Sequence, residues 1–223
     1  MDRIGLNTNY IQVVDVDGTA SYGGSQLWFK EESLDIYRQG CGVIAAVDAC
    51  LYMTKTYRIT RTAYIGLVDD FIKHRFLMRL FLKGKRFAIG VVPAQITSYL
   101  NAGHFFTDSH RFIWNGRHGH IHMYDSLKEM LIDEIPVIWG LYFVGKTIRL
   151  YTCDSQGHLV DTGQKINNHY VTVTGVLEDT DSHIRIIEVS SWGKRYYIDY
   201  EEYLQCCGKS LISGYCSNIV AII

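Results

Sequence analysis

The sequence predicts an α+β protein in which helices come first and an antiparallel sheet follows. Before about residue 135 the long apolar segments have helical spacing, and after it apolar residues alternate with the period of two that is typical of strands. The chain has 223 residues, of which 48% are hydrophobic, and this suits one domain over residues 1–223. We expect a helical lobe at about 26–134 and a sheet lobe at about 135–223.

The first half contains the segments with helical patterns. Residues 43–53 are apolar on nearly every helical face and are interrupted by Asp48, which is typical of a helix inside a core. The residues before them are rich in glycine turns and carry short apolar pieces at 10–14 and 27–29. The other expected helices are residues 62–83, residues 93–100 (ended by Gly103) and residues 126–132.

The second half contains the segments that alternate like strands. They are residues 137–143, 147–151, 170–176, 184–189, 196–198 and 217–223. Because these strands follow the helices without alternating with them, we expect an antiparallel sheet packed on the helical half.

The polar residues 177–183 connect two of these strands and predict a hairpin. With the turn centred near residue 179, His169 at the start of the first strand lies opposite Ser190 on the second. Glu188, two residues before Ser190, shares its strand face. A slip of one residue would instead place Val189 opposite His169.

The composition argues against several classes of protein. The formal net charge is −1, which argues against electrostatically driven binding to nucleic acid or to an anionic membrane surface. No stretch is long and apolar enough for a membrane-spanning helix, and the N-terminal residues carry no apolar signal core. We therefore expect a cytoplasmic protein whose six cysteines are thiols.

Cys41 stands between two glycines, Gly40 and Gly42, at the start of the apolar segment. At the first turn of a helix the unpaired N–H groups and the dipole favour an anion, so this position predicts a thiolate with a lowered pKa. The same N–H groups could hold a developing oxyanion. Cys41 is then a nucleophile; the alternative is a small buried side chain of the core.

Three segments resemble those of papain-like cysteine peptidases: GCGVIAA around Cys41, HYVTVTGV from His169, and VSSWG from Val189. The first two are most similar to the bacterial branch that includes bacteriocin-leader-processing peptidases, and the third to the Asn-Ser-Trp-Gly segment of papain itself. The resemblance covers about residues 26–205 and implies a papain-like two-lobed fold with the cleft between the lobes. It also implies a peptide or protein substrate, no cofactor, and hydrolysis of a peptide or other amide through an acyl-thioester. Cys41 would be the nucleophile and His169 the general acid and base.

The third catalytic residue departs from the pattern of that family. Ser190 stands where the family has Asn or Asp, and it lacks both the charge and the amide of those residues. Glu188 on the same strand face is the alternative partner for His169. Trp192 would cover the contact between His169 and its partner.

The oxyanion donor departs from the family as well. Six residues before the cysteine the family has a glutamine, whereas this chain has Asp35, whose negative charge makes it a poor donor. Gln39 and Gln26 are the two candidates to replace it. These departures keep a second interpretation open, in which the chain is a catalytically inactive or binding version of the fold.

A histidine-rich segment supports a third class, a metal-dependent protein. In a strand, the last three of its histidines would share one face, as zinc ligation requires. No neighbouring Cys or Glu pattern completes a metal motif, so the segment is better interpreted as a polar, partly exposed strand or loop and we expect no metal. The candidate ligands are His104, His110, His118, His120 and His122, with Asp108 or Asp125.

Overall fold

The computed structural model describes residues 2–6, 9–74, 78–82, 85–103, 105, 110–118, 120, 122–179, 184–207 and 210–223. For residues 74, 78–82, 85–89 and 117–118 it describes the backbone alone. Within this part the chain combines helices with mainly antiparallel sheets, which confirms the expected α+β class.

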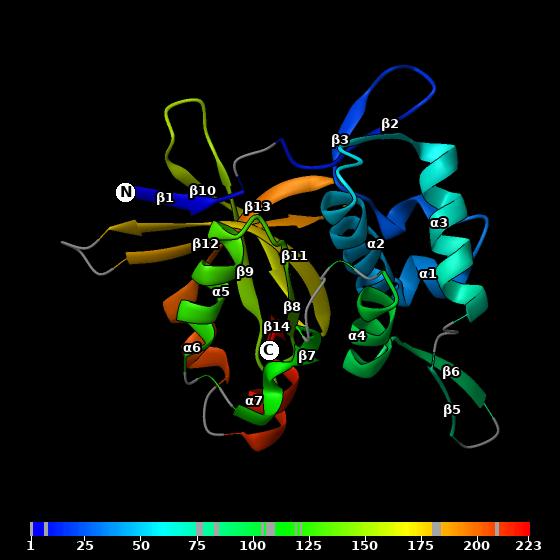
Figure 1. Cartoon of the computed structure of the whole chain (residues 1–223). Helices are drawn as coiled ribbons and strands as arrows, with labels where there is room; N and C mark the ends of the chain where they lie inside the picture. Colours follow the sequence, from blue (N-terminus) through cyan, green and yellow to red (C-terminus); the bar gives the residue numbers. More distant parts are fainter. Residues whose placement is uncertain are drawn as a thin grey trace.

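A seven-stranded antiparallel sheet dominates the fold (Figure 1). Its order is β1-β11-β12-β13-β9-β10, and β8 pairs with the same edge of β11 that β1 occupies further along. The central strand β11 is buried along most of its length, which explains why its sequence is rich in valine and threonine. The strands are β1 (Asp2–Gly5), β8 (Val137–Leu141), β9 (Ile148–Cys153), β10 (Leu159–Ile166), β11 (His169–Asp179), β12 (Ile184–Ser191) and β13 (Lys194–Asp199).

The helices lie in two groups at opposite sides of the sheet (Figure 1). The first group is α1 (Leu34–Gln39), α2 (Cys41–Met53), α3 (Arg61–His74) and α4 (Pro93–Asn101). The second group is α5 (Met123–Ile132), α6 (Tyr200–Cys207) and α7 (Leu211–Cys216). Short 3₁₀ helices are η1 (Gln26–Phe29) and η2 (Asn115–His118). The remaining strands form small sheets from β2 (Gln12–Val14), β3 (Ala20–Tyr22) and β4 (Arg58–Thr60), from β5 (Met78–Leu82) and β6 (Lys85–Gly90), and from β7 (Phe112–Trp114) and β14 (Val220–Ile222).

Helix α2 lies inside the core. It packs against β11 and β8 on one side and against α3 and α4 on the other, so that ten of its 13 residues are buried. This environment explains the apolar residues on all of its faces. The helix begins at Cys41, two residues before the apolar segment 43–53. It begins there because Gly40 is both the last cap of α1 and the first cap of α2. The Gly40 amide donates to the carbonyl of Ile36 at 2.8 Å, and the Gly40 carbonyl accepts from Ile44 at 3.0 Å.

Most of the other expected elements form, with ends that differ by a few residues. The helix expected at 62–83 is wrong beyond His74, because residues 78–82 form β5 and pair with β6. The sheet also contains two strands that the alternation did not predict. One is β10, which is largely exposed and polar. The other is β1, which comes from the N-terminal end of the sequence.

The register expected between the strands of the β11–β12 hairpin is wrong. Thr172, and not His169, lies opposite Ser190. Asp179 pairs with Ile184, which centres the hairpin between residues 181 and 182 and not near residue 179, and a β-bulge within β11 shifts the pairing again. His169 lies beyond the end of this pairing and faces Leu141 of β8 instead.

The turn between β12 and β13 ties the sheet to the segment that contains β3. Trp192 and Gly193 form this two-residue turn with φ of 50° and 75°, and a type I′ hairpin turn requires positive φ at both positions. The carbonyl of Gly193 accepts from the amide of Tyr22 at 2.8 Å, and its amide donates to the carbonyl of Gly24 at 2.9 Å. Two regions that are about 170 residues apart in the sequence are therefore held together by backbone hydrogen bonds.

All six cysteines are free, as expected. Cys153 is exposed and Cys207 is buried, whereas the other four are partly exposed. None of the helices within the described ranges is long and apolar enough to cross a membrane.

We predict that position 42 does not tolerate a side chain. A Cβ on Gly42 would lie 2.5 Å from Cγ2 of Val91 and 2.9 Å from Cδ2 of Tyr170. Gly42→Ala should therefore lower the free energy of unfolding by about 1–3 kcal/mol, the usual cost of overpacking a core. Gly66→Ala on α3 is the matched control, because its added Cβ would meet no atom within 4 Å. The control should raise the stability by about 0.5–1 kcal/mol. Urea denaturation measures both variants, and equal stabilisation by both would contradict the packing.

Candidate active site

Residues from both halves of the chain line one narrow pocket between α2 and the sheet. Cys41 comes from α2, Gln26 from η1, His169 from β11, and Ser191 and Trp192 from the end of β12 and its turn. The cavity volume is about 10 Å³, which is the space that one water molecule needs. The pocket therefore brings together a thiol, an imidazole, an amide and a hydroxyl in a site with little room for water.

Cys41 occupies the first position of α2, as the sequence predicts. The cap before it is Gly40, which has no side chain to bond the free amides of the first turn. Contrary to the expectation of a lowered value, burial raises the pKa of the Cys41 thiol. The backbone N–H groups of Tyr170, Gly42 and Cys41 itself act in the opposite direction but do not outweigh the loss of solvent. The thiol is therefore protonated at neutral pH.

His169 lies at the beginning of β11 and is 9% exposed. Its Nε2 lies 2.7 Å from Oγ of Ser191. The Trp192 ring stacks on the imidazole with 4.6 Å between ring centroids and 26° between their planes. Trp192 therefore covers the imidazole, although the partner of the ring is not the one that we expected. Burial lowers the pKa of His169 to about 4, so the ring is neutral at pH 7.

The predicted partners of the imidazole, Ser190 and Glu188, are both wrong. Oγ of Ser190 donates to the carbonyl of Tyr22 at 2.9 Å. The Glu188 carboxylate accepts from Arg3 at 3.0 Å and from Thr174 at 2.8 Å. Both predictions depended on the hairpin register, which changes because the hairpin is centred between residues 181 and 182 and because β11 contains a β-bulge.

Ser191 is the residue that the sequence did not single out. It lies between Ser190 and Trp192 in the same VSSWG segment, and it precedes the turn that places the Trp192 ring over His169. The sequence signal that could have identified Ser191 is the glycine at position 193, which favours a type I′ turn at Trp192 and Gly193. A tight turn at that point fixes the direction of the residue directly before it.

The two glutamines proposed for the oxyanion differ in their placement. Gln26 is buried and lines the pocket, and its Nε2 donates to the carbonyl of Tyr37 at 3.0 Å. Gln39 is the last residue of α1 and is not among the residues that line the pocket. Gln26 is therefore the better placed of the two.

Asp48 is a buried carboxylate on α2 that also borders the pocket. Its two oxygens accept from the Gly24 amide at 3.0 and 3.1 Å, from the Tyr64 hydroxyl at 2.7 Å and from the Tyr10 hydroxyl at 3.2 Å. Burial raises its pKa to about 6, although these hydrogen bonds oppose the shift. Because Gly24 lies two residues before Gln26, this carboxylate fixes the segment that brings Gln26 to Cys41.

The last histidines of the histidine-rich segment do not lie together on a strand, which the metal-dependent alternative would require. Residues 115–118 form η2, and His122 has a φ of 58° directly before α5. Nε2 of His120 lies 2.9 Å from the carbonyl oxygen of Ser217, and the exposed His122 ring lies 3.9 Å from Asp125. His104 and Asp108 lie outside the described residues. Within the described residues, no three His, Cys, Asp or Glu side chains form a group that could hold a metal ion.

We predict that Asp48→Asn changes how stability depends on pH. The pKa of the carboxyl is about 6 in the folded protein against an ordinary value of 3.8, so the folded protein keeps the proton in a range where the unfolded chain loses it. The contribution of Asp48 to stability is therefore greatest below about pH 4 and falls until about pH 6. Asn mimics the protonated form, so the stability of the variant relative to the unchanged protein should rise by roughly 3 kcal/mol from about pH 4 to about pH 7. Urea denaturation at several pH values measures this, and a difference that is constant with pH would contradict it.

Comparisons of the chain with family models, with curated proteins and with solved structures found no match. The papain-like resemblance therefore rests on the residues around Cys41, His169 and Trp192 alone. The function has to be inferred from the chemistry of the pocket that these residues line.

Proposed function

We propose that this chain is a papain-like cysteine hydrolase that cleaves a peptide or other amide through an acyl-thioester on Cys41. The observation that carries the proposal is the single pocket that Cys41 and His169 line together with Gln26, Ser191 and Trp192. This chemistry requires a nucleophile, a base, a group that orients the base and an amide that donates to the oxyanion. The substrate is then a peptide or protein met in the cytoplasm, and the reaction needs no cofactor.

The proton of the thiol would move to His169. When Ser191 accepts a hydrogen bond from Nε2–H, the other ring nitrogen, Nδ1, is unprotonated and basic. Among the described residues the imidazole and the Cys41 thiol share no hydrogen bond, so the proposal requires them to approach when a substrate enters. Such tightening is common, because catalytic hydrogen bonds are often long before the substrate binds.

The covalent steps follow from these positions. Sγ of Cys41 gives its proton to His169 and attacks the carbonyl carbon, and the resulting oxyanion faces the free amides at the start of α2. His169 then returns the proton to the leaving amine, and the C–N bond breaks. Water next attacks the thioester with His169 as base, which releases the acid and restores the thiol.

Gln26 is the side chain that would assist the oxyanion. Its Nε2 donates to the Tyr37 carbonyl, and an amide nitrogen carries a second N–H that can point into the pocket. Asp48 holds the preceding residues through the Gly24 amide. A donor that is fixed before the reaction stabilises developing charge without reorganisation, so this arrangement would favour the transition state.

Two observations favour the second candidate function, a catalytically inactive or binding version of the same fold. The volume of about 10 Å³ leaves no room for a peptide unless side chains move. In addition, burial raises the pKa of the thiol at Cys41, whereas an active thiolate needs a lowered value. Transfer of an acyl group to Cys41 separates the two functions.

We predict that a small activated ester acylates Cys41. With p-nitrophenyl acetate, the acetyl group should transfer to Sγ of Cys41 as p-nitrophenolate leaves, and water should then release it. Mass spectrometry of quenched samples locates the acetyl group. His169→Ala should slow this acylation by at least about 100-fold, because a general base contributes that much or more.

Cys153→Ser is the matched control, because Cys153 is an exposed thiol. It should leave the rate of release of p-nitrophenolate unchanged. Acetylation of Cys153 without acetylation of Cys41 would exclude the hydrolase, as would an unchanged rate at Cys41 in His169→Ala. Either result from a folded protein would favour the catalytically inactive or binding version of the fold.

We also predict that Ser191, and not Ser190, supports the base. Ser191→Ala should slow acylation of Cys41 by about 2–10-fold, which corresponds to one neutral hydrogen bond. Ser191→Thr keeps the hydroxyl and should restore most of the rate. Ser190→Ala is the control, because its hydroxyl binds the Tyr22 carbonyl and not the ring. A larger loss in Ser190→Ala than in Ser191→Ala, measured by the same ester assay, would show that Ser191 does not orient His169.

A further inference from the structure

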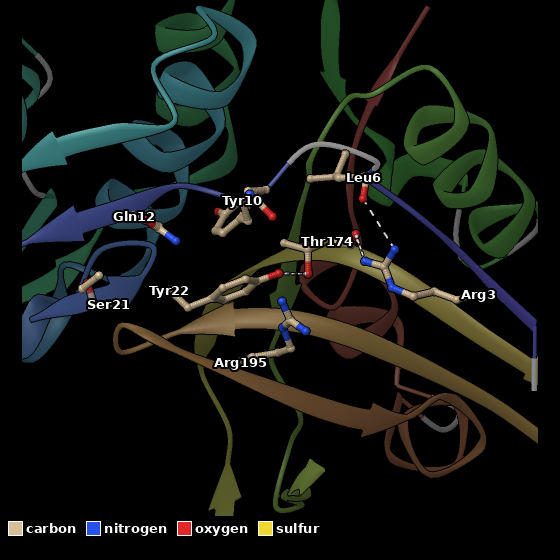
Figure 2. A pocket seen from close by; sticks show the side chains of 10 residues that line it. Arg3, Leu6, Tyr10, Gln12, Ser21, Tyr22, Thr174 and Arg195 are labelled. Atoms are coloured by element: carbon tan, nitrogen blue, oxygen red, sulfur yellow. Dashed lines mark hydrogen bonds between the residues drawn. The ribbon is translucent and has the colours of Figure 1, made fainter. Parts of the chain in front are cut away.

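A second and larger pocket lies beside the first, where β1, β3, β11 and β13 meet (Figure 2). Its volume is about 440 Å³, which is within the usual range of about 300–1,000 Å³ for small-molecule sites. Tyr10 and Tyr22 form part of its lining, with 4.8 Å between their ring centroids. The hydroxyl of Tyr10 reaches Asp48, which also borders the pocket that holds Cys41.

The charge of this pocket is positive. Arg3 and Arg195 line it, and none of the ten described residues around it is acidic. Glu188 lies behind the lining and is 2% exposed on its side chain. It contacts Arg3 at 3.0 Å and Arg195 at 3.9 Å, so one carboxylate is shared between two guanidinium groups. The pocket therefore has an excess of one positive charge.

Hydrogen-bond donors point into this pocket from several strands. Figure 2 shows the guanidinium groups of Arg3 and Arg195 directed toward Tyr22 and Thr174 from different sides. The Arg3 group also reaches the Thr174 carbonyl at 3.4 Å. The Arg195 group lies 4.4 Å from the Tyr22 ring centroid, and its contact with Glu188 is at the outer limit for an ion pair. Gln12 also lines the pocket, and its side-chain amide makes no hydrogen bond to any residue that the structure describes, whereas its backbone N–H donates to the Tyr57 carbonyl at 2.8 Å.

We infer that this pocket binds a small, polar molecule through a carboxylate or phosphate group. The planar fork of N–H groups on arginine matches both of these oxyanions, and the 3.9 Å between Arg195 and Glu188 is too long for a hydrogen bond. If the two arginines served only to neutralise Glu188, Arg3 at 3.0 Å would suffice for its single charge. Glu188 pairs closely with Arg3, so a bound oxyanion supplies Arg195 with a closer negatively charged partner.

Isothermal titration calorimetry on the full chain tests this inference. The probes are inorganic phosphate, citrate and adenosine monophosphate, and glucose is the neutral reference. At least one anionic probe should bind, and its affinity should fall as sodium chloride is added because the contact is electrostatic. Binding by citrate alone would identify a carboxylate ligand, whereas binding by phosphate or the nucleotide alone would identify a phosphate ligand.

Arg195→Gln should weaken this binding by at least about tenfold, which is typical of the loss of one charge-assisted contact. Arg149→Gln is the matched control, because Arg149 has a similar exposure and pairs with Glu202 outside this pocket. Gln12→Leu removes a donor without touching Glu188, so it should also weaken binding and remains informative if Arg195→Gln does not fold. The inference is overturned if no anionic probe binds more tightly than glucose, or if a folded Arg195→Gln or Gln12→Leu binds as well as the Arg149→Gln control.

Discussion

The buried carboxylate of Asp48 is the interaction on which both pockets depend. It lies on the core helix α2 and accepts hydrogen bonds from Gly24, Tyr10 and Tyr64. Gly24 lines the pocket that contains Cys41, whereas Tyr10 lines the second pocket, which contains Arg3 and Arg195. A carboxylate without such partners would not remain at this depth, because the loss of hydration would cost several kcal/mol by the usual order of magnitude. The raised pKa shows that even these bonds offset the cost only in part.

The segment from Ala20 to Gly24 is held from the sheet as well. The turn at Trp192 and Gly193 bonds to the backbone of Tyr22 and Gly24, and Ser190 donates to the Tyr22 carbonyl. The residues that surround the imidazole and the residues that lead to Gln26 are therefore fixed to the same few backbone groups. A shift of this turn would change the surroundings of His169 and of Gln26 together. The Ser190 hydroxyl does not contact the imidazole, but it is buried because it bonds to the Tyr22 carbonyl of this segment.

The sequence predicts the core helix, most strands and a shared pocket for Cys41 and His169, because each depends on a local pattern of apolar residues or on a short motif. It does not predict the partner of the imidazole. That partner depends on where the β11–β12 hairpin is centred and on a β-bulge. Because a strand places its residues on alternate faces, each of these changes alters which side chain lies beside the ring. The strand β1 was missed for a similar reason, since long-range pairing leaves no local signal. The direction of the pKa shift at Cys41 was wrong because burial outweighs the helix N-terminus there.

Burial acts on the two proposed catalytic groups in opposite directions. It raises the pKa of the Cys41 thiol and lowers that of the His169 imidazole, so both groups are neutral over a wide range of pH. A positive side chain beside the thiol would stabilise the thiolate, but Arg3 and Arg195 line the other pocket, where Glu188 shares their charge. A resting ion pair between thiolate and imidazolium is therefore not favoured. In the proposed reaction the proton therefore moves as the substrate carbonyl arrives, when the amides of α2 can stabilise the negative charge on the new oxyanion.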